Sequence, residues 1–255
     1  MITIKKPSEI EAMREGGRIL AEVMGKLEKE IAPGKNTLEL DKLAEELVFA
    51  NGGKPAFKGY GAENGNPFPA TVCASLNSEI VHGIPDKNKI MRVGDIIKID
   101  IGMKYKEMFT DMARTFAVGK ISSEAQKLIA VTEKSFWKGL EKLKARNFLS
   151  DYSKAVQGCA ESAGFSVVRN LVGHGVGREL HENPCIPNYY NKKYSDVRLM
   201  AGMTLALEPM INAGKYETVL DKDGWTFLTS DGKLSAHYEN TVLITEKGAE
   251  VLTKV

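Results

Sequence analysis

Two stretches of this 255-residue chain, VGDIIKID (residues 93–100) and AGMTLALE (residues 201–208), repeat one pattern. Each has glycine in second place, continues as an apolar strand and ends on a carboxylate, Asp100 in the first and Glu208 in the second. A carboxylate in a run that is otherwise suited to a buried strand needs a physical explanation, and here the same oddity occurs twice.

A second pair of matching segments lies upstream of the first. VHGIPD (residues 81–86) parallels GHGVGR (residues 173–178) and aligns His82 with His174. Because both matches occur in the same order, they favour an internal duplication. A duplicated unit would arrange the two histidines and the two acids around one pseudo-twofold axis, as a site between two halves.

Helical periodicity precedes the strand-like sequence in each half. The expected helices occupy residues 7–34, 36–53, 122–145 and a segment around 151–165. Two helices followed by strands, twice over, predict an α+β fold in which long helices cover one side of an antiparallel sheet. We expect residues 1–255 to form a single domain of two pseudo-symmetric halves, about 1–118 and 119–255.

Three of these helices carry capping signals at their beginnings. Ser8 with Glu11, and Ser123 with Gln126, have the spacing of a capping box. Asn36 is the predicted N-cap of the second helix.

Composition limits the class of protein and its partners. The 35 basic and 33 acidic residues give a net charge of +2, which requires neither a nucleic acid nor a membrane as partner. The three cysteines form no CxxC pair, as is typical of a reducing compartment. The N-terminal MITIKKPSEI lacks the apolar core of a signal peptide. We therefore expect a cytoplasmic protein.

Four acids lie in strand-like apolar sequence: Asp100, Asp111, Glu208 and Glu239. The segment between the first two, GMKYKEM (residues 102–108), predicts a hairpin turn that brings them together. A single such acid is explained by a strand end that faces water. Four of them, if buried, must be paired, protonated or bound to a metal.

The stretch NLVGHGVGRELHENP (residues 170–184) contains His174 and His181. Its three glycines beside the first histidine disfavour a helix. They predict a strand end or tight loop whose backbone comes close to another part of the molecule. With four acids and His174, the sequence predicts an oxygen-rich metal site.

The set Asp100, Asp111, His174, Glu208 and Glu239 offers too many ligand atoms for one ion but suits two ions with bridging carboxylates. Such sites favour manganese, iron(II), cobalt or magnesium. Two ions together activate water and polarise a carbonyl, so the expected reaction class is metal-assisted hydrolysis. Neither histidine begins an HExxH pattern.

The five residues, in this order and spacing, resemble the metal ligands of the methionine aminopeptidases. The segments HGIPD, GHGVG, LHENP, LEPM and YENT are similar to local signatures of that family, and the resemblance covers essentially the whole chain. It implies the pita-bread fold and the short, type I form of the enzyme.

The resemblance also implies residue roles. Asp100 would chelate one divalent ion, Asp111 and Glu239 would bridge two ions, and His174 and Glu208 would complete the ligands of the other ion. The metal would be manganese, iron(II), cobalt or zinc. Glu208 would also carry the proton to the leaving amine, while His82 and His181 would hydrogen-bond the substrate and the tetrahedral intermediate.

By position, Tyr60, Phe68, Cys73 and Trp225 resemble the lining of the methionine pocket. The sequence departs from the family pattern at Phe57, at Leu180 and at AENGN (residues 62–66), a short insertion beside this pocket. His237 has no role in the family. It lies two residues before Glu239 on the expected strand, so it is either a neighbour of the metal ligands or, as we predict, a partly exposed strand residue.

The function implied is removal of the N-terminal initiator methionine from nascent polypeptides, with preference for a small second residue. The enzyme would be a monomer with a transient ribosome contact. One alternative is a prolidase-like aminopeptidase of the same fold, which would carry an additional N-terminal domain. The other is a non-catalytic pita-bread binding protein, which would be expected to lack some of the five ligands.

Overall fold

The computed structural model describes residues 2–193 and 196–255. Its helices are α1 (Pro7–Glu30), α2 (Thr37–Ala50), η1 (Ala62–Asn64), α3 (Ser123–Leu140) and α4 (Leu149–Ser162). Its strands are β1 (Lys54–Pro55), β2 (Val72–Leu76), β3 (Glu79–Val81), β4 (Ile96–Tyr105), β5 (Met108–Ala117), β6 (Ser166–Val167), β7 (Gly173–Gly175), β8 (Glu182–Ile186), β9 (Thr204–Leu207), β10 (Met210–Asn212), β11 (Thr218–Leu220), β12 (Phe227–Thr229), β13 (Ser235–His237), β14 (Glu239–Ile244) and β15 (Ala249–Val251).

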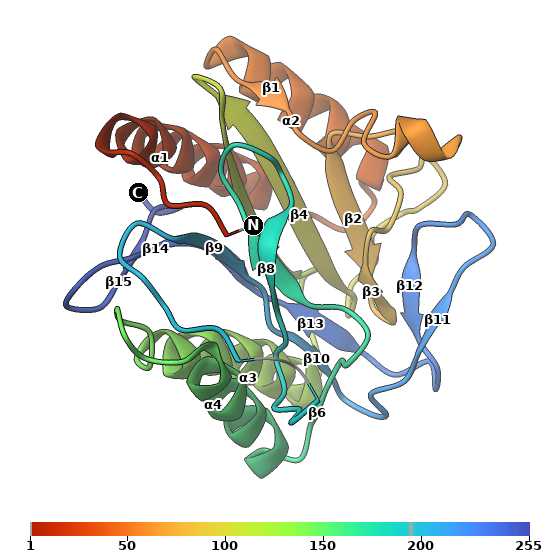
Figure 1. The fold of residues 1–255 in the computed structure, drawn as a ribbon. Coiled ribbons are helices and arrows are strands. Elements are labelled where there is room, and N and C mark those ends of the chain that lie inside the picture. The colour runs from red at the N-terminus through yellow and green to blue at the C-terminus, as the bar shows by residue number, and fades with distance from the viewer. Residues whose placement is uncertain (1, 194–195) are drawn as a thin grey trace.

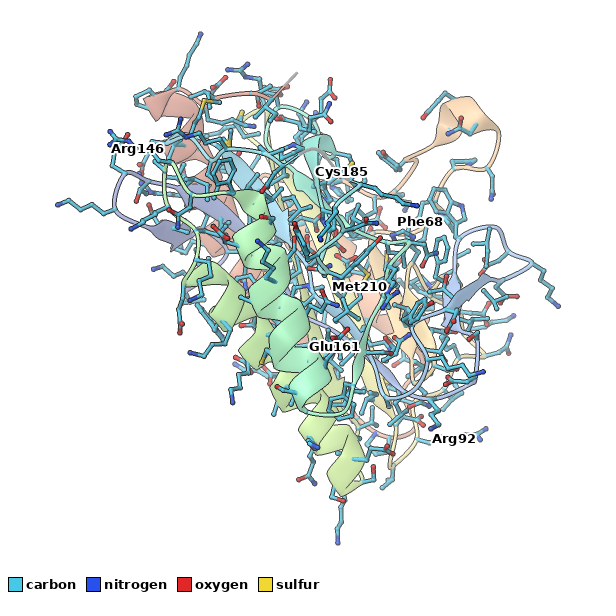
Figure 2. The ribbon with its side chains drawn as sticks, turned by 60° about the horizontal axis from the view of Figure 1, so that its bottom comes forward. Phe68, Arg92, Arg146, Glu161, Cys185 and Met210 are labelled. Atoms are coloured by element: carbon cyan, nitrogen blue, oxygen red, sulfur yellow. The ribbon has the colours of Figure 1, made fainter. Side chains whose placement is uncertain are left out.

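The main sheet joins strands from both ends of the chain. Its order is β1-β4-β5-β14-β9-β7-β8, with β2 paired to β4 and β15 paired to β14. Every pairing in it is antiparallel. Figure 1 shows α1 and α2 at one end of this sheet and α3 and α4 at the other. Figure 2, turned to bring α3 and α4 forward, shows the two helices side by side, with Glu161 on α4.

One face of the sheet packs against the helices. Ile97, Ile99 and Ile101 of β4 belong to the same buried cluster as residues of α1 and α2. Leu205 and Leu207 of β9 belong to a cluster with residues of α3 and α4. Each fully buried side chain of this size contributes about 1.5–3 kcal/mol. The predicted α+β fold, with helices on one side of an antiparallel sheet, is confirmed.

Strand register then fixes which residues point to the other face. Asp100 pairs with Ala113 and Asp111 with Gly102, so both acids lie on the face opposite Ile97, Ile99 and Ile101. Glu239 pairs with the same Ala113 across the β5–β14 junction, which puts it on that face too. The acids of the apolar strands therefore gather on one side because alternate residues must pack on helices.

Two of the three predicted helix caps are wrong by one or two residues. α1 begins at Pro7, a residue suited to the first helical position, and the Lys6 backbone N–H donates to the Glu9 carboxylate (2.7 Å). In α3 it is Ser122, one residue before the expected Ser123, whose hydroxyl accepts from the Ala125 N–H (3.1 Å).

The third cap is confirmed, since the side chain of Asn36 accepts from the Glu39 N–H (3.1 Å). Within the described ranges, none of the helices combines the length and the apolar character needed to cross a bilayer.

Candidate metal centre and substrate cavity

The five predicted ligands line one cavity of about 90 Å³. Ligand atoms of Asp111, His174 and Glu239 all lie within 4.8 Å of one another. Glu208 and Glu239 form a second such group with His237. Asp100, on β4, is in contact with Asp111 and is 8% exposed. The structure thus brings together all five residues, from four strands and the segment after β9.

The hairpin between β4 and β5 explains how Asp100 meets Asp111. The turn residues Lys106 and Glu107 both have positive φ (46° and 65°), as in a type I′ turn. The resulting register sets the two acids diagonally across the strand pair rather than directly opposite. Diagonal neighbours on one face lie close enough for their carboxylates to interact.

The carboxylates of this cluster lack partners that would balance their charge. No residue within 2–193 and 196–255 donates a hydrogen bond to the buried oxygens of Asp100 (Oδ1), Asp111 (Oδ1) and Glu239 (Oε1). Burial, reinforced by the charges of neighbouring acids, raises the pKa of Asp100, Glu208 and Glu239 well above its usual value. Divalent cations would supply the missing partners, so the donor set fits a metal centre with mostly oxygen ligands.

His174 is prepared to act as a ligand through Nε2. Its Nδ1–H donates to the Gly175 carbonyl oxygen (2.9 Å), which leaves the lone pair on Nε2. Nε2 lies 3.7 Å from Glu208 Oε1. Burial lowers the pKa of His174 to about 3, so the ring is neutral, as a metal ligand must be.

The glycines around His174 allow close backbone packing, as the sequence predicted. A Cβ on Gly173 would lie 2.5 Å from the Ala206 carbonyl oxygen, and one on Gly175 would lie 2.3 Å from the Asn183 carbonyl oxygen. Neither distance is compatible with a side chain. The strand that carries His174 is therefore held tightly between β8 and β9.

His82 and His181 also line the cavity. Burial lowers the pKa of His82 to about 4 and also lowers that of His181, so both rings are neutral near pH 7. His181 Nδ1 lies 2.7 Å from the Tyr60 hydroxyl, and its ring centroid is 4.3 Å from that of His174. His82 follows β3 with φ of 58°, and its ring packs edge-on against Trp225 with the ring centroids 6.4 Å apart.

The rest of the cavity wall is apolar. It consists of the four residues predicted from the sequence, Tyr60, Phe68, Cys73 and Trp225, together with Phe57 and Leu180. Phe68 packs edge-on against Trp225 with centroids 5.3 Å apart. Phe57 and Leu180 are 8% and 5% exposed. The sequence marked these last two as departures from the family pattern that would alter the pocket, and the structure makes them part of the wall.

The AENGN segment contains η1 and lies beside the cavity rather than in it. Asn66 Nδ2 donates to the Asp223 carbonyl oxygen (3.4 Å), close to Trp225 in the chain. The segment therefore braces the loop that carries one wall residue.

This chain is similar to known proteins in both sequence and structure. A sequence profile of metallopeptidase family M24 matches residues 11–246. The methionine aminopeptidase of Clostridium perfringens is 48% identical over 256 residues, with 100% of both chains covered. The chain belongs to the methionine aminopeptidases of this family. Methionine aminopeptidase 1 of Bacillus subtilis is 47% identical, again with 100% of both chains covered.

Solved structures agree with this assignment. The crystal structure of methionine aminopeptidase from Thermotoga maritima superposes with a TM-score of 0.95 at 44% identity and covers 100% of both chains. Prolidase from Pyrococcus furiosus gives a TM-score of 0.79 at 25% identity, and the match spans 99% of this aminopeptidase but 65% of the prolidase. The pita-bread fold is confirmed, and the prolidase-like alternative is disfavoured. M24 is a metallopeptidase family, so divalent-metal use agrees with the donor set.

The prediction for His237 is wrong. This residue is 1% exposed, and its Nε2 lies 3.3 Å from Glu208 Oε2 and 4.0 Å from Glu239 Oε2. Two residues before Glu239 on an extended chain, His237 shares the face of that ligand, and this spacing was the available signal. The aminopeptidase therefore has a second imidazole at its acidic cluster, besides that of His174.

Proposed function

We propose that this aminopeptidase hydrolyses the first peptide bond of nascent polypeptides that begin with methionine. The observation that carries the proposal is the meeting of unpartnered buried carboxylates and an apolar wall in one small cavity. We assign two divalent ions, of manganese, iron(II), cobalt or zinc, to Asp100, Asp111, His174, Glu208 and Glu239.

Glu239 takes part in both groups of ligand atoms, which supports a bridging role for it, and we assign the second bridge to Asp111. Asp100 would chelate one ion, and His174 and Glu208 would complete the ligands of the other. When bound, the ions would polarise the substrate carbonyl and lower the pKa of the attacking water.

Glu208 is the proposed proton carrier from the attacking water to the leaving amine. Its two oxygens have different neighbours: Oε1 faces His174 Nε2 (3.7 Å) and Oε2 faces His237 Nε2 (3.3 Å). One oxygen would thus share the metal with His174, while the other lies beside His237 without a hydrogen bond to it. With an imidazole next to each oxygen, the carboxylate would have little room to turn while it accepts and releases the proton.

His181 and His82 are the proposed hydrogen-bond donors to substrate. If neutral His181 accepts at Nδ1 from the Tyr60 hydroxyl, its Nε2–H remains as a donor. Such donors stabilise the negative charge that develops on the carbonyl oxygen.

The wall of aromatic and small apolar side chains suits an unbranched thioether, so we assign Tyr60, Phe68, Cys73 and Trp225 to methionine binding. Crowding beside the metal ligands would favour a small second residue.

The main sheet has strands from the first part of the chain on one side of the β5–β14 junction and strands from the second part on the other. This arrangement supports a single domain with halves at about residues 1–118 and 119–255. Substrate from the ribosome implies a cytoplasmic enzyme with a transient ribosome contact, and we propose a monomer.

The test is hydrolysis of Met-Gly-Met-Met, Leu-Gly-Met-Met and a Met-Pro peptide by metal-stripped protein, with Mn(II), Co(II), Fe(II) or Zn(II) restored one at a time. We expect metal-dependent cleavage confined to N-terminal methionine. Cleavage with another preference would reject the pocket assignment but keep the metal chemistry. Folded protein that is inactive with every metal would overturn the proposed function.

A further inference from the structure

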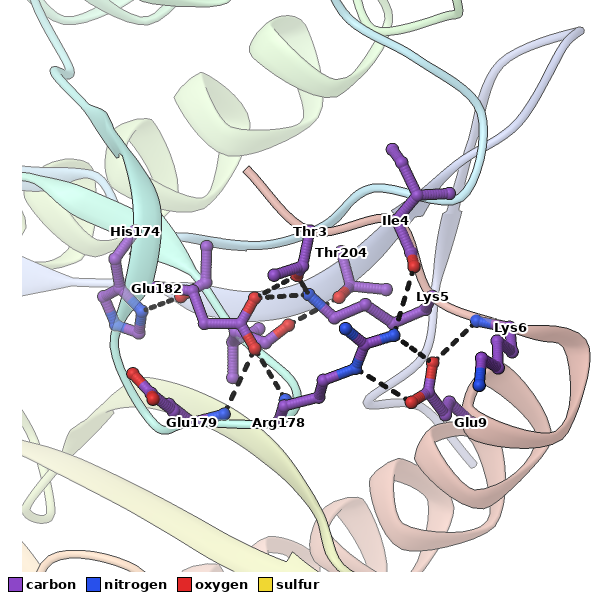
Figure 3. A network of polar contacts seen from close by, with 12 residues as sticks. Thr3, Ile4, Lys5, Lys6, Glu9, His174, Arg178, Glu179, Glu182 and Thr204 are labelled. Carbon is purple, nitrogen blue, oxygen red and sulfur yellow. Dashed lines mark hydrogen bonds and ion pairs between the residues drawn. The ribbon is translucent and has the colours of Figure 1, made fainter. Parts of the chain in front are cut away.

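The N-terminal segment, residues 2–6, lies against the loop of residues 177–182 that carries His181 (Figure 3). Lys5 Nζ pairs with Glu182 Oε2 at 2.5 Å, and the two side chains are 1% and 5% exposed. The Thr3 hydroxyl contacts both of these groups. A charged pair is thus buried between two segments 177 positions apart in the chain.

Glu182 connects this pair to the shape of the loop. Its other oxygen, Oε1, accepts the backbone N–H of Arg178 (2.6 Å) and that of Glu179 (3.1 Å). One carboxylate therefore holds the N-terminal segment with one oxygen and closes the turn before His181 with the other. The residue next to His181 in the chain thereby fixes the path of the backbone on which His181 sits.

Lys5 has little freedom to be elsewhere. Its backbone N–H donates to the Gly202 carbonyl oxygen (2.9 Å). Its side chain passes directly over Gly177, where φ is 150° and an added Cβ would lie 2.3 Å from Lys5 Cε. Gly177 is also tied to the sheet, because the Phe109 N–H donates to its carbonyl oxygen (2.6 Å).

A buried ion pair is seldom the most stabilising way to fill such a space, since apolar side chains of similar volume do as well. What paired charges add is conformational specificity, because only the arrangement of the two segments that pairs both charges avoids a buried charge without a partner. We propose that Lys5 and Glu182 are positioning residues that lock the 177–182 loop so that His181 faces the substrate, a proposal that rests on the proposed role of His181.

The experiment compares Lys5→Met with Arg178→Met. The control removes an ion pair between the same loop and α1, Arg178 Nε to Glu9 Oε1 (2.8 Å), whose side chains are more exposed, at 43% and 21%. Both variants leave the five proposed ligands untouched, so Co(II) binding to the metal-stripped protein should match that of the parent. The imidazole ¹H–¹³C spectrum reports on His181 without any catalysis, and His181→Ala assigns its signal among four histidines.

We expect Lys5→Met to shift the His181 signal and to lower kcat for Met-Gly-Met-Met by about 10- to 100-fold with little change in KM, because small misplacements of a catalytic group have effects of this size. Arg178→Met should leave kcat within about twofold, as for an exposed ion pair. Lys5→Met, Glu182→Gln and their double variant should lose similar factors, since either change opens the same lock.

A folded Lys5→Met protein with an unchanged His181 signal and unchanged kcat would overturn the proposal. A shifted signal with unchanged kcat in both Lys5→Met and His181→Ala would keep the lock and reject the proposed role of His181. If Lys5→Met fails to fold, the double variant, in which neither charge is left without its partner, carries the same comparison.

Discussion

The cavity has an acidic floor, formed by Asp100, Asp111 and Glu239, and a rim, formed by Tyr60 and His181, and different parts of the fold hold the two in place. The floor acids Asp100, Asp111 and Glu239 lie on β4, β5 and β14, at 8%, 3% and 2% exposure. The rim rings of Tyr60, which is 41% exposed, and His181 lie on loops. Sheet register fixes the floor, so it can change only if strand pairing changes. Side-chain contacts and turns fix the rim, which leaves it free to vary in shape while the chemistry of the floor is kept.

The largest effect should follow from a change in the floor. Asp111→Asn removes a proposed bridging carboxylate and should reduce kcat by about 10³-fold or more, since metal ions contribute several kcal/mol to charge stabilisation. Peptide hydrolysis and Mn(II) titration of the folded variant measure this. A fully active, metal-replete Asp111→Asn protein would reject the bridging assignment.

A change in the rim should separate catalysis from metal binding. His181→Ala should lower kcat by about 10²-fold, the size of effect seen when one oxyanion donor is removed. Metal content should stay at the parent level because His174, not His181, is the proposed ligand. An emptied metal site in this variant would reverse the assignment of the two histidines.

The floor should also respond to pH. Burial raises the pKa of Asp111 to about 7, and the other acids shift in the same direction. When the pKa of a carboxyl is higher in the folded protein than in the unfolded chain, the protonated group stabilises the fold at low pH. This contribution to the free energy of unfolding is lost as the pH rises from the unfolded pKa through the folded pKa. Metal-free protein should therefore become less stable over that range.

Bound metal displaces those protons, so Mn(II) affinity should rise with pH by up to about tenfold per unit for each proton released. Calorimetric titration between pH 5.5 and 8, with melting temperatures of both forms, tests this. An affinity independent of pH would mean that the acids are already ionised before metal binds.

The smallest effect should come from the apolar wall. Phe57→Leu should lower kcat/KM for Met-Gly-Met-Met by about three- to tenfold, near the lower end for a small change in an apolar pocket. Phe49→Leu is the matched control, because Phe49 lies on α2 at 57% exposure. Equal losses in the two variants would argue against contact between Phe57 and substrate.

The same contrast governs what the sequence could predict. Acids such as Asp100 and Glu239 stand out because a buried strand has no ordinary use for them. Phe57 and Leu180 stood out only through the family resemblance, since apolar residues have the same appearance in a core and in a pocket wall. His237 was misplaced because a lone histidine near a strand end is commonly half exposed, and this expectation outweighed its spacing of two residues from Glu239.

Local signals also failed where neighbours offered equal alternatives. Ser122 and Ser123 have nearly the same capping ability, and the chain uses the first. The contact of Lys5 with Glu182 had no signature at all, because nothing in the sequence relates two charges so far apart.

The seat of the N-terminal segment has a practical consequence for anyone who handles this protein. Thr3 and Lys5 are engaged in the interior, whereas Val255 is 87% exposed. An affinity tag or fusion partner joined directly before Thr3 would disturb the contacts of Thr3 and Lys5 with Glu182, which hold the His181 loop. The same addition after Val255 would extend into solvent. Preparations that differ only in the end that carries the tag should differ in turnover.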